Sequence, residues 1–179
     1  MKAVMISIKP KWVEKMVSGE KTIEVRKTVP KLETPFKCFI YCSKGARFNH
    51  KENKDMRQHW IRLALEHTQG KVIGEFICDY IIKAERGHYV DLVKAGCRID
   101  GVELLNYADD KPLYGLHISD LKIYDNPKEI TSFYKCPRVQ CDKCYGEIMN
   151  ERLKKYGRCA ECLRLTRPPQ SWCYMEVIG

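Results

Sequence analysis

The sequence predicts an α+β protein: a small, strongly bent sheet or barrel with helices at its periphery. In residues 1–134, segments with strand character outnumber segments with helix character. Strands and helices do not alternate strictly along the chain, which disfavours a doubly wound parallel sheet. The chain has 179 residues, of which 44% are hydrophobic. A chain of this length has room for a core that buries roughly 70% of its unfolded surface.

The first two elements are predicted to be a strand at 4–8 and a helix that begins at Pro10. Proline is favoured at the first position of a helix, and Gly19 suits the C-terminal cap. Between these two residues, apolar side chains recur at helical spacing, and we expect the charged side chains to face water. The apolar stripe consists of Trp12, Val13, Met16 and Val17, and the charged face consists of Lys11, Glu14 and Lys15.

Two strands are predicted next. Polar and apolar residues alternate over 22–27, which is typical of a strand with one polar face. Thr22, Glu24 and Arg26 share that face. Residues 36–42 form a continuous apolar run, as expected of a strand that is covered on both sides.

Four further segments complete the predicted body of the protein. Residues 53–68 place apolar side chains among charged ones in the pattern of an amphipathic helix, and residues 71–82 are the longest strand candidate. Asp100 is a suitable N-cap for a short helix that extends to residue 107. Residues 113–124 predict one or two strands.

The charge of the chain favours an anionic partner. It carries 32 Lys and Arg against 23 Asp and Glu, a net charge of +9, and basic residues recur through 9–57 and 135–167. Such a surface attracts nucleic acid and other polyanions; the alternative is an excess of lysine spread over the surface without function. No apolar run reaches the roughly 18 residues of a membrane span, and no signal segment is recognisable. We therefore expect a cytoplasmic protein without a membrane partner.

Five of the ten cysteines lie close together, which predicts a metal site. Cys141 and Cys144 form one CxxC pair, Cys159 and Cys162 form a second, and 14 residues separate the two pairs. Four thiolates at about 2.3 Å complete a closed tetrahedral zinc site, which has no open position and is therefore structural. Cys136 is a fifth candidate that either replaces one ligand or stays free. Buried thiols or redox disulfides are the alternative.

The cysteines also define the predicted domain organisation. Residues 1–134 form the barrel body, residues 135–168 form a zinc module inserted before the last strand, and residues 169–179 return as the final strand. The basic residues of the module either contact phosphates or balance the negative zinc centre. A further possibility is that the module docks a protein partner.

The order of strand, helix and then G-x-K-T-x-E-x-R over 19–26 resembles the ASCH family, whose domains share the PUA-like barrel. The segments GKVIGEFICDYI, YGLHISDLKIYDNPKEI and RPPQSWCYMEV are also similar to ASCH segments of bacterial and phage chromosomes, and a Cys-rich insert before the last strand recurs in some of those proteins. The resemblance covers most of the chain and is weakest over 46–69 and 84–110. It implies a PUA-like barrel with a cleft beside it.

The resemblance implies that this cleft binds RNA or a modified nucleoside. Basic side chains engage phosphates or base acceptors, a carboxylate accepts from an exocyclic amine, and an aromatic ring stacks on a base. Trp172 is a stacking candidate, and the alternative is that it packs at the end of the barrel. The implied ligand-binding residues are Lys9, Trp12, Lys21, Glu24, Arg26 and Trp172.

A hydrolase at the same cleft is the alternative function, an amidohydrolase or a ribonuclease, with Lys21, Glu24 and Glu75 as catalytic candidates. A branch of small ASCH proteins that resembles this chain hydrolyses the acetyl amide of N4-acetylcytidine. Lys21 and Arg26 match its motif, and Glu75 matches a glutamate on a later strand. The position of the threonine nucleophile, however, holds Glu24.

Thr22 does not replace that nucleophile, because a shift of two residues moves its hydroxyl by about 6.5–7 Å. Nucleophilic catalysis tolerates far less. We therefore expect a binding protein. His117, flanked by apolar residues, is expected to face the cleft or solvent.

Overall fold

The computed structural model describes residues 3–45, 56–135 and 164–175. Cys136, Cys141, Cys144, Cys159 and Cys162, and with them the predicted zinc site, lie outside the described residues. No helix within the described ranges is long and apolar enough to span a membrane.

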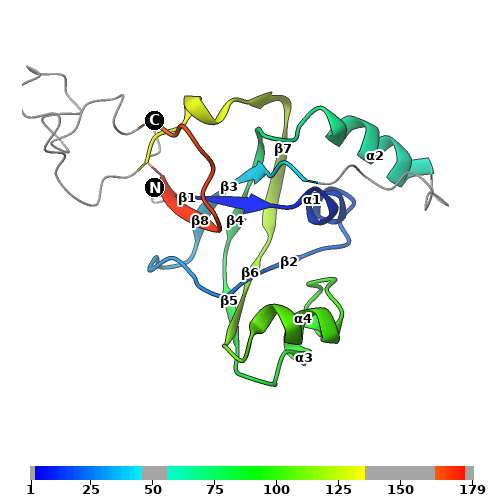
Figure 1. Cartoon of the computed structure of the whole chain (residues 1–179), viewed down its shortest axis with the longest axis vertical. Helices are drawn as coiled ribbons and strands as arrows, with labels where there is room; N and C mark the ends of the chain where they lie inside the picture. The colour runs from blue at the N-terminus through cyan, green and yellow to red at the C-terminus, as the bar shows by residue number, and fades with distance from the viewer. Residues whose placement is uncertain (1–2, 46–55, 136–163, 176–179) are drawn as a thin grey trace, which may run out of the picture.

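The described strands form two hydrogen-bonded sheets (Figure 1). The larger has the order β7-β4-β3-β1-β8 and consists of Ser119–Lys128, Val72–Cys78, Phe36–Cys42, Ala3–Ile8 and Trp172–Met175. Only β1 and β3 pair in parallel there; the other neighbours are antiparallel. The smaller sheet has the order β2-β6-β5 and consists of Ile23–Arg26, Leu113–His117 and Ile81–Ala84.

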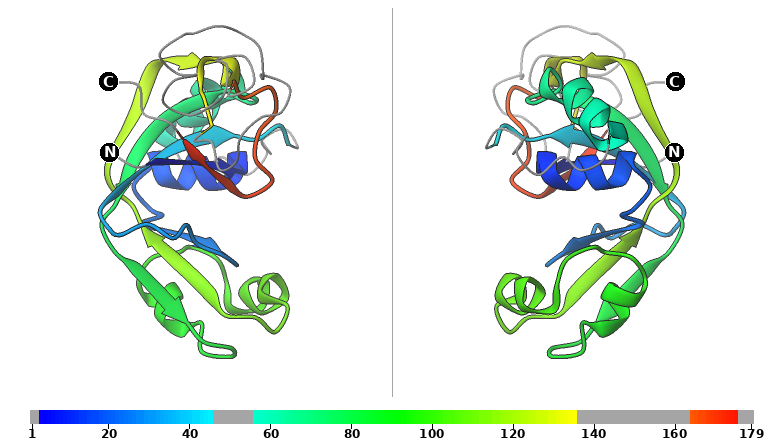
Figure 2. Two further views of the ribbon diagram at one scale, coloured as in Figure 1. Left: turned by 90° about the vertical axis from the view of Figure 1, so that its left-hand side faces the viewer. Right: turned by 90° about the vertical axis from the view of Figure 1, so that its right-hand side faces the viewer.

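Two nearly continuous runs of strand, β4–β5 and β6–β7, connect the sheets and are antiparallel to each other. Two residues separate β4 from β5, and Ile118 alone separates β6 from β7. Each run therefore belongs to the large sheet at one end and to the small sheet at the other, and both runs curve around α1 (Figure 2). The predictions of an α+β protein and of a strongly bent sheet are confirmed.

The expected barrel does not close through the described strands. β2 has four residues and pairs only with β6, so its second edge forms no ladder with the large sheet. A side chain spans the gap instead: Nη2 of Arg26, on β2, donates to the carbonyl oxygen of Ser7, on β1, over 2.6 Å. The separation between the two sheets leaves room for a site.

The helices lie where the sequence predicts three of them, and a fourth was not expected. α1 (Pro10–Val17) and α2 (Met56–Glu66) lie near the large sheet, and α4 (Gly101–Ala108) is capped by Asp100, whose Oδ1 accepts from the Glu103 amide over 2.8 Å. The additional helix is α3 (Val90–Lys94), and a 3-10 turn, η2 (Ile130–Ser132), precedes the end of the second described range.

Three apolar clusters hold these layers. The first lies between the large sheet and α1 and includes Val13 and Met16. The second packs the small sheet against α3 and α4 through Leu92 and Leu104. The third covers the outer face of the large sheet and includes Phe39.

One expectation for α1 is wrong. Glu14 does not face water: it is 9% exposed, and Oε1 accepts from Nε of Arg62 over 2.7 Å. The reason is that α2 packs against α1 and covers that side of the helix.

Candidate functional site

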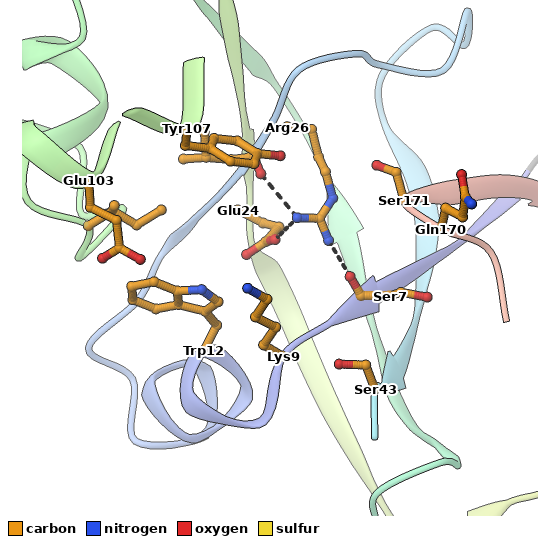
Figure 3. A pocket seen from close by; sticks show the side chains of 12 residues that line it. Ser7, Lys9, Trp12, Glu24, Arg26, Ser43, Glu103, Tyr107, Gln170 and Ser171 are labelled. Carbon is orange, nitrogen blue, oxygen red and sulfur yellow. Dashed lines mark hydrogen bonds and ion pairs between the residues drawn. The ribbon is translucent and has the colours of Figure 1, made fainter. Parts of the chain in front are cut away.

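A cavity of about 300 Å³ opens where β1, α1, β2 and α4 meet (Figure 3). The residues that line it come from β1 and β2, from the start of α1, from one face of α4 and from the segments that adjoin β3, α4 and β8. They are Ser7, Lys9, Trp12, Glu24, Val25, Arg26, Ser43, Ile99, Glu103, Tyr107, Gln170 and Ser171. Four of the six residues predicted to bind a ligand, namely Lys9, Trp12, Glu24 and Arg26, therefore share one cavity.

The centre of the cavity wall is an ion pair on β2. Glu24 and Arg26 are two residues apart and share a strand face, and Nη1 of Arg26 lies 2.5 Å from Oε1 of Glu24. The side chain of Glu24 is 3% exposed and that of Arg26 is 12% exposed. Lys21 contributes a second cation, with Nζ 3.4 Å from Oε2 of the same carboxylate. Two positive groups thus contact one buried carboxylate.

Arg26 is fixed by the backbone as well as by Glu24. Nη1 donates to the carbonyl oxygen of Val25 over 3.1 Å, and Nη2 donates to that of Ser7. Within the described residues, Nε of Arg26 and Oε2 of Glu24 are buried and form no hydrogen bond. Oε2 of Glu24 is therefore held by the ion pair with Lys21 alone, and Nε of Arg26 has no acceptor among the described residues.

Lys21 supports the site from behind. Its side chain is 1% exposed and is not part of the cavity lining. Nζ donates to the carbonyl oxygen of Cys97 over 2.7 Å. Burial lowers the pKa of Lys21, and the Glu24 carboxylate opposes that shift. Lys21 thus positions Glu24 and the segment that leads into α4.

The Thr22 hydroxyl is also engaged away from the cavity. Its Oγ1 donates to the carbonyl oxygen of Ala95 over 2.8 Å. The chain fits closely here, because a Cβ at Gly96 would collide with Thr22 and Gly96 has a φ of +98°. Thr22 therefore holds the segment between α3 and α4 in place.

Trp12 and Lys9 come from the start of α1, which Pro10 begins. The ammonium groups of Lys11, Lys15 and Lys21 lie 4.2, 5.4 and 5.1 Å from the centroid of the Trp12 ring. In Figure 3 the indole nitrogen points towards the side of Lys9 and Glu24. Lys9 is exposed and has no ion-pair partner among the described residues. Trp12 thus presents an N–H donor, and Lys9 an available cation, to the cavity.

Sequence reasoning missed the wall that α4 supplies. Glu103 and Tyr107 are four residues apart, so they lie on one face of α4, and both line the cavity. Oε1 of Glu103 lies 2.8 Å from Nζ of Lys11, which ties α4 to α1. The sequence contained a signal for this wall. Leu104 and Ala108 are the buried residues of α4, and Glu103 and Tyr107, at the same spacing, each directly precede one of them.

Glu75 does not join this cavity. Its Oε1 accepts from Nζ of Lys37 and its Oε2 from the Tyr124 hydroxyl, each over 2.7 Å. Partial burial disfavours its charge, but these hydrogen bonds outweigh that effect and hold the pKa of Glu75 below its ordinary value. Among the described residues, Glu75 thus contacts Lys37 and Tyr124 and lies apart from the cavity lining.

The reason is a change of strand parity. Glu75 pairs with Phe39 of the outer cluster, whereas Ile73 and Phe76 both belong to the inner cluster although they are three residues apart. The pairing of β4 with β7 shifts register between Val72 and Gly74. Such an irregularity turns the following side chains to the opposite face.

Two other candidates, Trp172 and His117, do not line the cavity. Trp172 lies next to lining residues in the sequence. Nε1 of Trp172 donates to both oxygens of Thr28 over 3.1 Å, and its ring meets that of Tyr174 edge-on at 5.2 Å. Trp172 directly follows the lining residues Gln170 and Ser171. His117 pairs through Nδ1 with Oδ1 of Asp79 at 2.6 Å and does not line the cavity.

Comparison with solved structures identifies the fold. The chain is similar to ASCH from Zymomonas mobilis, with 15% identity over 98% of this chain and 88% of that one and a TM-score of 0.54. Two single-residue variants of the same protein give TM-scores of 0.57 at 14% identity over 98% of this chain, with 91% and 89% of theirs covered. No family model and no curated protein matches the sequence. At this level of identity the likeness concerns architecture, and the chain has the fold of ASCH proteins.

Proposed function

We propose that the cavity binds RNA or a modified nucleoside. The observation that carries this proposal is the Glu24 carboxylate, held in the cavity wall by two cations beside the indole of Trp12 and the ammonium of Lys9. A nucleobase offers what this wall can recognise: a flat ring whose edge carries donors and acceptors. A cavity of about 300 Å³ is at the small end of ligand sites, and it suits a single base better than a folded nucleic acid.

The geometry supports each binding role by charge and position. The carboxylate of Glu24 accepts from an exocyclic amine or a ring N–H, and the indole of Trp12 donates to a ring nitrogen or carbonyl. Lys9, exposed at the rim, attracts a phosphate. Arg26 fixes the carboxylate. Lys21 acts through Glu24, and Trp172 acts through the segment that ends at Ser171.

The same placement supports binding over hydrolysis. Lys21 lies behind the wall, the Thr22 hydroxyl is bonded to Ala95, and Glu75 lies on the outer face of the large sheet. Lys21, Thr22 and Glu75 do not line the cavity. Of the catalytic candidates, only Glu24 is therefore in a position to face a ligand there.

We also propose that Cys141, Cys144, Cys159 and Cys162 hold one structural zinc ion, with Cys136 as an alternate ligand. Two CxxC pairs provide the donor set of a closed tetrahedral site, and zinc bound there stabilises the fold of its segment. The basic residues of this segment favour the same anionic partner as the cavity, in the cytoplasm, with docking of a protein as the alternative role.

The test is a binding series with fluorescein-labelled single-stranded RNA and with free nucleosides, including N4-acetylcytidine. The variant Lys9→Gln keeps the fold, because the Lys9 side chain caps no helix and pairs with no described residue. The control is Lys83→Gln, which changes an exposed lysine that forms an ion pair with Glu85. We expect Lys9→Gln alone to lose affinity, by about 1.5–3 kcal/mol for a charged hydrogen bond.

Equal affinities of Lys9→Gln and Lys83→Gln would contradict the proposal. Chromatography of the same mixtures tests the alternative function. We expect no product, and product from the wild-type protein would favour the hydrolase.

A further inference from the structure

The cavity contains two aromatic side chains, and their surroundings differ. Trp12 has three ammonium groups within 5.4 Å of its ring centroid, and one of them, from Lys11, is held by Glu103. Tyr107 has one ammonium group, that of Lys27, at 5.3 Å. Lys27 has no ion-pair partner among the described residues. Cations that already occupy the indole leave less of its surface for a ligand.

Tyr107 lies outside the apolar core that its own helix helps to form. It is 37% exposed and belongs to none of the three apolar clusters, although Leu104 and Ala108 on the same helix are fully buried. Its hydroxyl forms no hydrogen bond with the described residues. In Figure 3 the Tyr107 ring lies on one side of the Glu24 carboxylate and Trp12 on the other. A large ring that lies outside the three apolar clusters and lines a cavity is placed for a ligand.

We infer that Tyr107 is the stacking surface for the base, and that it, rather than Trp12, selects planar ligands; this inference rests on the proposed function. A base that packs on the Tyr107 ring brings its edge towards Glu24 and the Trp12 N–H, and it brings an attached phosphate towards Lys27. Stacking is tolerant of base identity because every base has a π-face, so recognition of the edge falls to Glu24. α4 thereby supplies the stacking surface of the cavity, and β2 supplies the carboxylate that recognises the base edge.

The experiment uses the full chain and a short single-stranded RNA that contains 2-aminopurine, whose fluorescence is quenched when the base stacks. Three variants are compared with the wild type. Tyr107→Ala removes the ring, Tyr107→Phe keeps the ring without the hydroxyl, and Leu105→Ala truncates an exposed side chain on the same helix.

We expect Tyr107→Ala to weaken binding by roughly tenfold or more and to abolish the quenching, in line with the usual contribution of base stacking. Tyr107→Phe and Leu105→Ala should bind and quench as the wild type does, and all four proteins should have the same melting temperature. If Tyr107→Ala binds and quenches like the wild type, the inference is wrong while the proposed function stands. If the wild type itself binds no RNA or nucleoside, the proposed function fails first and the inference fails with it.

Discussion

Arg26 and Glu24 meet side chain to side chain on one face of β2, with 2.5 Å between Nη1 and Oε1, and the same guanidinium reaches across to the carbonyl oxygen of Ser7 on β1. One ion pair therefore does two things. It forms part of the wall of the cavity, and it joins the two sheets where no backbone pairing does so in the described strands. If the proposed function holds, stability and ligand binding depend on the same two residues.

The first prediction concerns that double role. Glu24→Gln leaves the buried cations Lys21 and Arg26 without a counter-charge, and we expect the free energy of unfolding to fall by about 3–5 kcal/mol. Denaturant unfolding measures it. The control is Glu103→Gln, which breaks an exposed pair in the same cavity and should cost about 1 kcal/mol or less. Equal losses in the two variants would show that the Glu24 pair is not a buried structural pair.

The second prediction concerns acid stability. The folded protein holds the pKa of Glu75 below its ordinary value, so this carboxylate contributes stability above about pH 4.5 and loses it as the pH falls. In Glu75→Gln, we expect the free energy of unfolding to fall less steeply with decreasing pH below about 4.5. Tyr124→Phe removes one of the two donors and should show part of the same change. Denaturant unfolding at several acidic pH values tests this, and parallel curves for all three proteins would contradict it.

The third prediction concerns salt. If Lys9 contacts a phosphate of single-stranded RNA, its removal should lower the slope of log affinity against log salt concentration by about 0.7. Fluorescence anisotropy at increasing salt measures the slope for the wild type and Lys9→Gln. Lys83→Gln, whose ammonium already pairs with Glu85 at 2.6 Å, should keep the slope of the wild type. Affinity of the wild type that does not change with salt would indicate an uncharged ligand.

The fourth prediction concerns zinc. Elemental analysis of the purified protein should find one zinc ion per chain, and a chelator should make four additional thiols reactive towards an alkylating reagent. Cys42 and Cys78 should remain slow to react throughout, because burial raises the pKa of these thiols to about 11 and about 12. Absence of metal together with four freely reactive thiols before chelation would refute the site.

The outcome for individual residues shows which features a sequence alone makes predictable. Local signals were sufficient for α1, α4 and the β2 motif, because Pro10, Asp100 and the alternation of Glu24 and Arg26 act within a few residues. The resemblance to the ASCH family implied a cleft lined by Lys9, Trp12, Glu24 and Arg26, and these four residues of one strand–helix–strand unit do line one cavity.

Features that depend on distant segments were not predictable in this way. The register shift that turns Glu75 outwards arises from the pairing of β4 with β7, and the burial of Glu14 arises from the packing of α2. Tyr107 reaches the cavity only because the second cluster fixes α4 beside α1. No pattern within a few residues contains that information.

The most direct test of the central claim is to locate the contact between ligand and protein by photocrosslinking. A short single-stranded RNA with 4-thiouridine is bound to the full chain and irradiated, and the crosslinked peptides are identified by mass spectrometry. Trp12 and Tyr107 lie in different tryptic peptides, because lysine or arginine residues separate them along the chain. We predict crosslinks to the peptides that contain Trp12 or Tyr107, and their loss on competition with unlabelled RNA. Competed crosslinks that map only to peptides without a cavity-lining residue would contradict the claim that this cavity binds the base.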